Sequence, residues 1–136
     1  MIVYPAAIVH GAPDATAALA PGLPVTLLSA PGAVLFAGSL WWRNCVAAAR
    51  ARWPDTPVTD ILDCADASGL AMGALRGGVC RLVLWPDAPG WAAVEAIAIR
   101  QGGFVLPHAP PALDMSGRNA IRRLHGWLRD SPASGG

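Results

Sequence analysis

Six polar side chains of this sequence can do chemistry, and each of them lies at or just beyond the end of an apolar run. They are histidines, serines and aspartates, which exchange protons, form hydrogen bonds and hold protons or cations. Two predicted helices begin beside them, after 30–33 and at 66–69, and the free backbone N–H groups and dipole at a helix N-terminus can bind a small anionic metabolite. The six candidate residues are His10, Ser29, Asp63, Asp66, Ser68 and His108.

The elements that must position these side chains are short strands that alternate with helices. Prolines and glycines bound the apolar runs, and the stretches between them repeat apolar residues at helical spacing. We expect strands at 6–10, 24–29, 58–64, 80–85 and 104–106, and helices at 13–20, 33–53, 68–76, 91–101 and 116–129.

Apolar strands separated by helices are typical of an α/β fold with a mostly parallel sheet. The sequence predicts one domain over 1–130, with about five strands, flanking helices in a flavodoxin-like or Rossmann-like three-layer arrangement, and an amphipathic C-terminal helix. Residues 131–136 are expected to form a flexible tail. In open sheets of this kind ligands bind outside the carboxyl ends of the strands. The six candidates all fall at that edge.

The segment 25–37 has two interpretations. In one, a strand is followed by a turn at 30–32 and then by a helix; in the other, 25–29 and 33–37 pair as a hairpin around Pro31 and Gly32. The pattern does not decide between them.

The residues near the third strand have a second, structural interpretation. Asp66 and Ser68 are good N-cap residues for the helix that follows them. Asp63 and Asp66 lie three positions apart but have no histidine or glutamate close to them in the sequence, so we predict no metal site.

The absence of lysine excludes several kinds of enzyme. All ten basic residues are arginine, so Schiff-base aldolase chemistry, pyridoxal-phosphate anchoring and a P-loop lysine are impossible. No G-x-G-x-x-G string follows a predicted strand, which disfavours a standard dinucleotide fold. The formal net charge is +1, too small to hold nucleic acid by counterion release.

The cysteines and the apolar segments bear on localisation. Three cysteines at irregular spacing, Cys45, Cys64 and Cys80, indicate free thiols rather than a disulfide framework, which favours a cytoplasmic protein. Residues 15–42 carry no charge, but prolines and glycines interrupt them, so we expect no membrane span.

Two surface features indicate partners. Trp41 and Trp42 are adjacent on one predicted helix and cannot face the same way, so at least one is expected to be exposed or covered by a partner. Only 14% of residues are charged, against roughly 25% in an average soluble domain, and we therefore expect a homo-oligomer that buries an apolar face. The closing helix carries a basic face, which is typical of a solvated helix surface, of a contact with an acidic partner or of a contact with an anionic membrane surface.

The stretch Asp66-Ala67-Ser68-Gly69-Leu70 resembles the D-x-S-G-L stretch of STAS domains. In the anti-sigma-factor antagonists of that family the serine before the glycine is a phosphorylated switch, and the resemblance places this role on Ser68. The segment between the apolar strand and this motif is shorter here than in that family.

Two functions from different classes follow. The first is a small α/β domain that binds a small anionic metabolite at the carboxyl edge of its sheet. The alternative is a non-catalytic regulatory protein that meets a partner through Ser68 or the C-terminal helix. Neither interpretation names a catalytic residue, a cofactor or a reaction.

Overall fold

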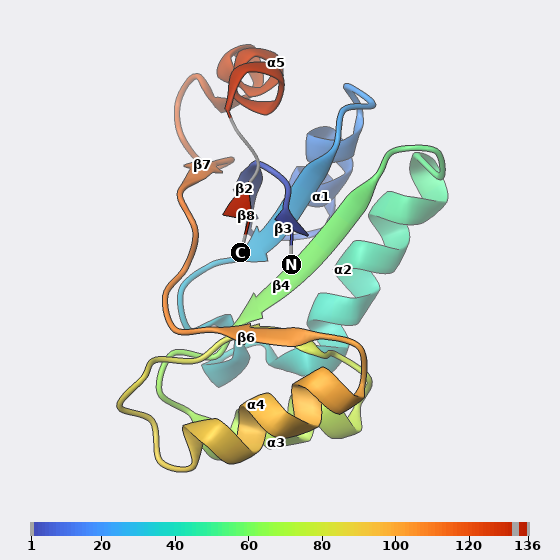
Figure 1. Cartoon of the computed structure of the whole chain (residues 1–136). Coiled ribbons are helices and arrows are strands. Elements are labelled where there is room, and N and C mark those ends of the chain that lie inside the picture. Colours follow the sequence, from blue (N-terminus) through green and yellow to red (C-terminus); the bar gives the residue numbers. More distant parts are fainter. Residues whose placement is uncertain (1, 132–133, 136) are drawn as a thin grey trace. The chain divides into compact units, whose positions relative to one another are not determined.

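A computed structural model describes residues 2–131 and 134–135 of the chain (Figure 1). The helices are α1 (Ala12–Leu19), α2 (Gly38–Arg52), α3 (Ser68–Arg76), α4 (Trp91–Arg100) and α5 (Ala120–Asp130), with a 3-10 helix η1 (Ala33–Leu35). The strands are β1 (Ile2–Val3), β2 (Ala6–Val9), β3 (Val25–Ser29), β4 (Val58–Asp63), β5 (Arg81–Val83), β6 (Phe104–Leu106), β7 (Ala112–Asp114) and β8 (Ser134–Gly135).

The main sheet has six strands in the order β6-β5-β4-β3-β2-β7. The pairs β2–β7, β4–β5 and β5–β6 are parallel. The predicted α/β fold, a mostly parallel sheet with flanking helices and a C-terminal helix, is therefore confirmed. The sheet has six strands rather than about five because 112–114, which lie next to the prolines at 107, 110 and 111, form β7 and pair with β2.

The strand order breaks at one place. From β2 to β6, strands that follow one another in the chain are neighbours in the sheet, whereas β7 lies on the other side of β2. The short second sheet consists of β1 and β8 in antiparallel pairing. Residues 132–133 and 136 of the predicted tail lie outside the described residues.

The chain divides into two compact units. The first comprises 1–28, 44–60 and 110–136, and the second comprises 29–43 and 61–109. The boundary falls within β3, α2 and β4, so each unit contains part of these elements. We describe each unit by itself.

The core of the first unit lies between its helices and strands: α1 packs against β2, α5 packs against β7, and the two helices contact each other. Their buried side chains recur at helical spacing, which is why these sequences form helices with one apolar face. The Trp127 indole donates a hydrogen bond of 2.8 Å to the carbonyl of Ala6, and the Thr56 hydroxyl donates one of 2.9 Å to the carbonyl of Leu19. The core includes Val9, Leu19, Val25, Leu27, Leu28, Leu113, Leu124 and Leu128.

The core of the second unit lies where α3 and α4 pack against each other and α4 packs against β6. Its strands are buried apolar runs bounded by glycines and prolines, as expected for parallel strands covered by helices. At Gly103 the backbone lies against the backbone of Cys80. A Cβ at this position would lie 1.8 Å from the carbonyl oxygen of Cys80, the shortest such distance for any described glycine. Only glycine fits there. The core includes Trp42, Ile61, Leu62, Leu75, Leu82, Val83, Leu84 and Val94.

The segment after β3 forms a turn and helices, so the hairpin interpretation of 25–37 is wrong. Gly32 adopts φ +67 and η1 begins directly after it. A left-handed residue followed by a helical turn directs the chain away from β3 and leaves 33–37 unable to pair with it. The predicted difference between the two adjacent tryptophans is confirmed, since Trp42 is buried and Trp41 is partly exposed.

Candidate functional site

The break in strand order brings together two strand ends of the first unit. β2 and β7 run in parallel with Ile8 opposite Asp114, and the N–H of Met115 donates to the carbonyl of Ile8 at 2.9 Å. His10 lies just beyond β2, and Asp114 is the last residue of β7. In open α/β sheets the crevice at such a change of order, outside the carboxyl ends of the strands, is the usual ligand site.

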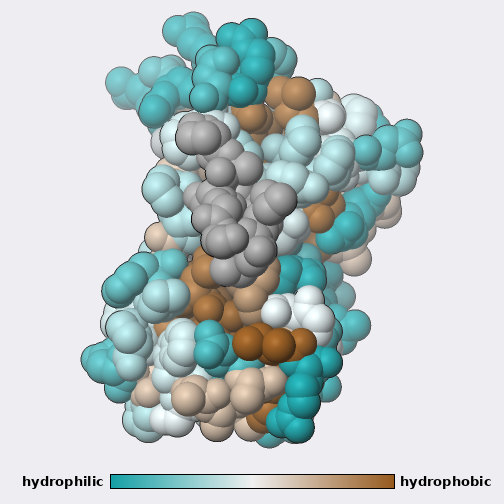
Figure 2. All heavy atoms as spheres, viewed as in Figure 1, coloured by the Kyte–Doolittle hydropathy of each residue, from teal (hydrophilic) through white to brown (hydrophobic). Residues whose placement is uncertain are grey.

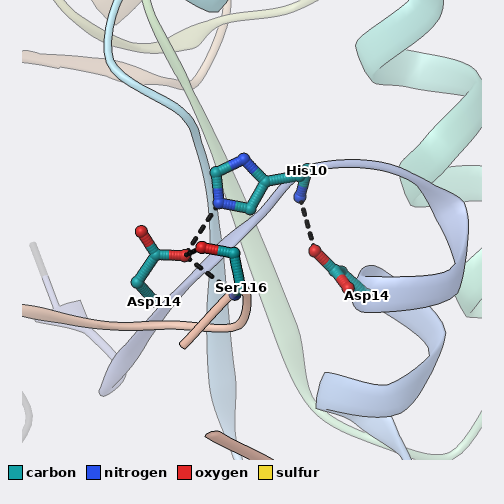
Figure 3. A network of polar contacts seen from close by, with 4 residues as sticks. All are labelled: His10, Asp14, Asp114 and Ser116. Atoms are coloured by element: carbon teal, nitrogen blue, oxygen red, sulfur yellow. Dashed lines mark hydrogen bonds and ion pairs between the residues drawn. The ribbon is translucent and has the colours of Figure 1, made fainter. Parts of the chain in front are cut away.

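His10 and Asp114 form a hydrogen-bonded pair at this edge. The Nε2 of His10 donates to Oδ1 of Asp114 at 2.8 Å, and the two side chains are 39% and 48% exposed. The same oxygen accepts hydrogen bonds from the backbone N–H of Ser116 at 2.9 Å and from its hydroxyl at 2.7 Å. Figure 3 shows all of these contacts converging on one carboxylate oxygen.

These contacts keep Asp114 ionised. Partial burial raises the pKa of Asp114, but hydrogen bonds from the Ser116 N–H, from His10 and from the Ser116 hydroxyl, together with attraction to the charged form of His10, outweigh it. The pKa of Asp114 is therefore below its ordinary value of 3.8. A carboxylate can only accept, so the ring nitrogen that faces it must carry the proton.

The backbone of His10 is also held in place. Its N–H donates to Oδ2 of Asp14 at 3.0 Å, and Asp14 is in the first turn of α1. An acidic side chain that reaches back from the first turn satisfies an N–H that would otherwise face solvent, and it interacts favourably with the helix dipole. Both the main chain and the ring of His10 are thus oriented by aspartates.

The arrangement can support proton transfer. With Nε2–H directed to Asp114, the neutral ring has its lone pair on Nδ1, and Figure 3 shows this nitrogen pointing away from Asp114. A histidine oriented by a carboxylate is a recurrent general acid–base group. Asp114, Ser116 and Asp14 then act as positioning residues around His10.

Ser29 and Asp63, in the second unit, end neighbouring strands and lie close together, but their side chains contact backbone atoms. The hydroxyl of Ser29 accepts the N–H of Asp63 at 2.8 Å and donates to the carbonyl of Ala30 at 3.3 Å. The Oδ1 of Asp63 accepts the N–H of Ala65 at 2.9 Å and that of Gly32 at 3.1 Å. Both side chains are buried, so these contacts hold the loops after β3 and β4.

The Asp63 carboxylate supports an unusual backbone conformation. Ala65 has φ +50 and is buried, a conformation that costs a non-glycine residue about 1 kcal/mol. Its N–H is bonded to Asp63, and its carbonyl accepts the N–H of Trp85 at 2.8 Å. These two hydrogen bonds offset the strain.

The other candidates in the second unit are separate from this pair. Asp66 and His108 are exposed. The hydroxyl of Ser68 donates to the carbonyl of Pro89. The expectation that Asp66 or Ser68 caps α3 is wrong: the N-cap is Ala67, without a side-chain cap, because the helix already begins at Ser68.

Three residues of the candidate site in the first unit were not predicted: Asp14, Asp114 and Ser116. Asp114 lies in a segment to which no element was assigned, and Ser116 was placed at the start of the last helix, which in the structure begins at Ala120. A detectable signal was the Asp-x-Ser spacing, because an aspartate that accepts the N–H two residues later is a common turn. Nothing in the local sequence connects this turn to His10.

Among the described residues, no group of three or more metal-binding side chains lies close enough to hold a metal ion. No helix in the described ranges is long and apolar enough to cross a membrane. No protein-family model matches the chain, and no curated protein matches it.

Proposed function

We propose that this protein binds a small anionic metabolite at the carboxyl ends of β2 and β7, where His10 contacts the ligand and exchanges a proton with it. The hydrogen bond of 2.8 Å between His10 and Asp114 carries the proposal. It joins residues from the ends of two neighbouring strands, at the break in strand order where open α/β sheets bind ligands.

An anionic ligand at this edge would need a cation beside the two carboxylates, and we propose that Arg118 supplies it. The oxygens of Asp14 and Asp114 that face His10 already accept hydrogen bonds. Arg118 follows Ser116 after one glycine and is exposed, and within the part of the chain that the structure describes it has no acidic partner. A ligand oxygen could therefore accept hydrogen bonds from Arg118 and from His10 protonated at Nδ1.

His10 would work in both directions of proton transfer. Its neutral ring accepts a proton at Nδ1, and the imidazolium so formed is stabilised by the Asp114 carboxylate that faces Nε2. Because the pKa of Asp114 is lowered, this carboxylate stays charged at neutral pH. The ligand needs only an oxygen that accepts a hydrogen bond from Nδ1–H or gives up a proton to Nδ1.

The test is an NMR titration of the full chain with ¹⁵N-labelled histidine. The chain has three histidines, so His108 and His125 serve as internal references. We expect inorganic phosphate, phosphomonoesters or small carboxylates to shift the ring signals of His10. The ligand that binds best is then titrated against variants.

His10→Gln should abolish that binding, and Asp114→Asn should weaken it about tenfold, the effect of losing roughly 1.4 kcal/mol. His108→Gln, which changes an exposed histidine of the second unit, should bind as the wild type does. If no anion in the set moves the His10 signals, or if His10→Gln binds as well as wild type, the proposal is wrong.

A further inference from the structure

Several large apolar side chains are exposed on the second unit, around η1 and the start of α3. Phe36 is 73% exposed and Leu40 is 68% exposed, values usual for charged rather than apolar residues. Figure 2 shows hydrophobic residues at the visible surface of this unit. We call the following set the η1/α3 surface: Leu35, Phe36, Leu40, Leu70 and Trp85.

The elements that carry this surface are tied together. η1 packs against α3, and Arg43 of α2 donates from Nη1 to the carbonyl of Gly77, at the end of α3, at 2.6 Å. Trp85 is joined to the loop after β4 through the hydrogen bond from its N–H to Ala65. A Cβ at Gly32 would meet both the Leu35 side chain and the Cβ of Ala65. The elements that carry the exposed apolar residues are therefore neighbours within the unit.

Most of this surface lies on uncharged segments. Neither 30–42 nor 67–75 contains a charged residue, and the exposed charges of Arg43, Asp66 and Asp87 lie at the margins of the surface. A charged partner would gain nothing here by electrostatic complementarity, whereas a second uncharged face would meet no repulsion. We propose that the η1/α3 surface is covered by the same surface of a second copy of this chain.

The exposed apolar area of this surface is large enough for a dimer interface. The exposed fractions of its five side chains correspond to on the order of 600 Å² of apolar area, the upper end for the largest patch on a monomer. Two such faces would bury about 1,200 Å², the lower bound for a specific interface, to which a polar rim adds. A two-fold axis would place Phe36 of each copy in contact with the surface of the other.

The inference does not depend on the His10 site. Its test is the oligomeric state of the full chain, measured by analytical ultracentrifugation from about 1 to 200 µM. Interfaces of about 1,600 Å² have micromolar or tighter affinity, and a smaller interface is expected at the weak end of that range. We expect a monomer–dimer equilibrium for the wild type. Phe36→Asp should raise the dissociation constant at least tenfold, because it buries a charge without a partner.

The matched control is Ile99→Asp. Ile99 is 58% exposed near the end of α4, and since helices of parallel sheets begin at the carboxyl edge and end at the opposite edge, it lies away from the η1/α3 surface. This variant should dimerise as the wild type does. Leu40→Asp is a second test of the surface if Phe36→Asp does not fold, as judged by circular dichroism.

Two results would overturn the inference. One is a wild-type chain that remains monomeric over the whole concentration range. The other is an equal effect of Phe36→Asp and Ile99→Asp, which would show that any added charge weakens association. A shift confined to Phe36→Asp and Leu40→Asp supports the proposed interface.

Discussion

Replacing Asp63 tests whether this buried carboxylate supports the fold or serves a ligand. Its Oδ1 accepts two backbone N–H groups, those of Gly32 and Ala65, and both residues are buried. Asp63→Ala removes the acceptor and leaves both donors without a partner inside the protein. Asp63→Asn keeps an acceptor oxygen at the same position, removes the charge and replaces the other oxygen with an NH2 group.

The expected loss follows from these contacts. A buried backbone donor without a partner costs about 1–3 kcal/mol, so two of them make Asp63→Ala less stable by roughly 2–4 kcal/mol after partial relaxation. The left-handed Ala65 also loses one of the hydrogen bonds that offset its strain. Asp63→Asn loses the strengthening that a charged acceptor provides, about 1 kcal/mol. The total free energy of unfolding of a typical domain is about 5–15 kcal/mol, so the loss expected for Asp63→Ala is a large part of it.

The assay is urea denaturation at pH 7, followed by tryptophan fluorescence and by circular dichroism. The free energy of unfolding should decrease in the order wild type, Asp63→Asn, Asp63→Ala. If Asp63→Ala costs less than about 1 kcal/mol, the two N–H groups find other acceptors and the structural role of Asp63 is refuted. Equal losses for the two variants would show that the charge, not the acceptor oxygen, is what matters.

Three further predictions concern other parts of the fold. Gly103→Ala should lower the free energy of unfolding by about 3 kcal/mol or more, or prevent folding, because the new Cβ would lie 1.8 Å from the Cys80 oxygen. Gly102→Ala, which adds only left-handed strain at φ +85, should cost about 1 kcal/mol by the same denaturation assay. Because the pKa of Asp114 is lower in the folded state than its ordinary 3.8, its stabilising effect is present above about pH 5 and is lost as the pH falls through the folded pKa. The stability difference between wild type and Asp114→Asn should therefore shrink as the pH falls from about 5 to about 2, and a difference that grows over this range would contradict the lowered pKa. Burial, and to a smaller extent the nearby Asp63 carboxylate, raise the pKa of the Cys64 thiol to about 12, so iodoacetamide at pH 8 should label Cys64 only after unfolding, as peptide mass spectrometry would show.

The positions of most elements were predictable because they depend on neighbouring residues. Apolar runs bounded by glycine and proline predicted the strands, and the predicted bounds of β6 and α3 are those observed. The strand β7 could not be found in this way. It is a short segment with one large apolar residue, Leu113, and it is a strand only because it pairs with β2.

The candidate site, too, could be predicted from the sequence only in part. That His10 would lie at the carboxyl edge followed from its position after an apolar run. Its partner Asp114 is 104 positions away in the chain, and no local pattern connects the two residues. For Ser29 and Asp63 the predicted edge position was right, but only the structure shows that their side chains turn inward to bind the backbone.

The amino-acid sequence by itself determined the α/β class, the order of most of its elements and the exclusion of lysine-dependent chemistry, because composition and local periodicity are properties of the chain alone. Tertiary structure decided which strand lies beside β2, which side chain orients His10, and which apolar residues remain exposed. Those outcomes depend on contacts between distant segments, whose free energies come from pairing and burial rather than from local preference.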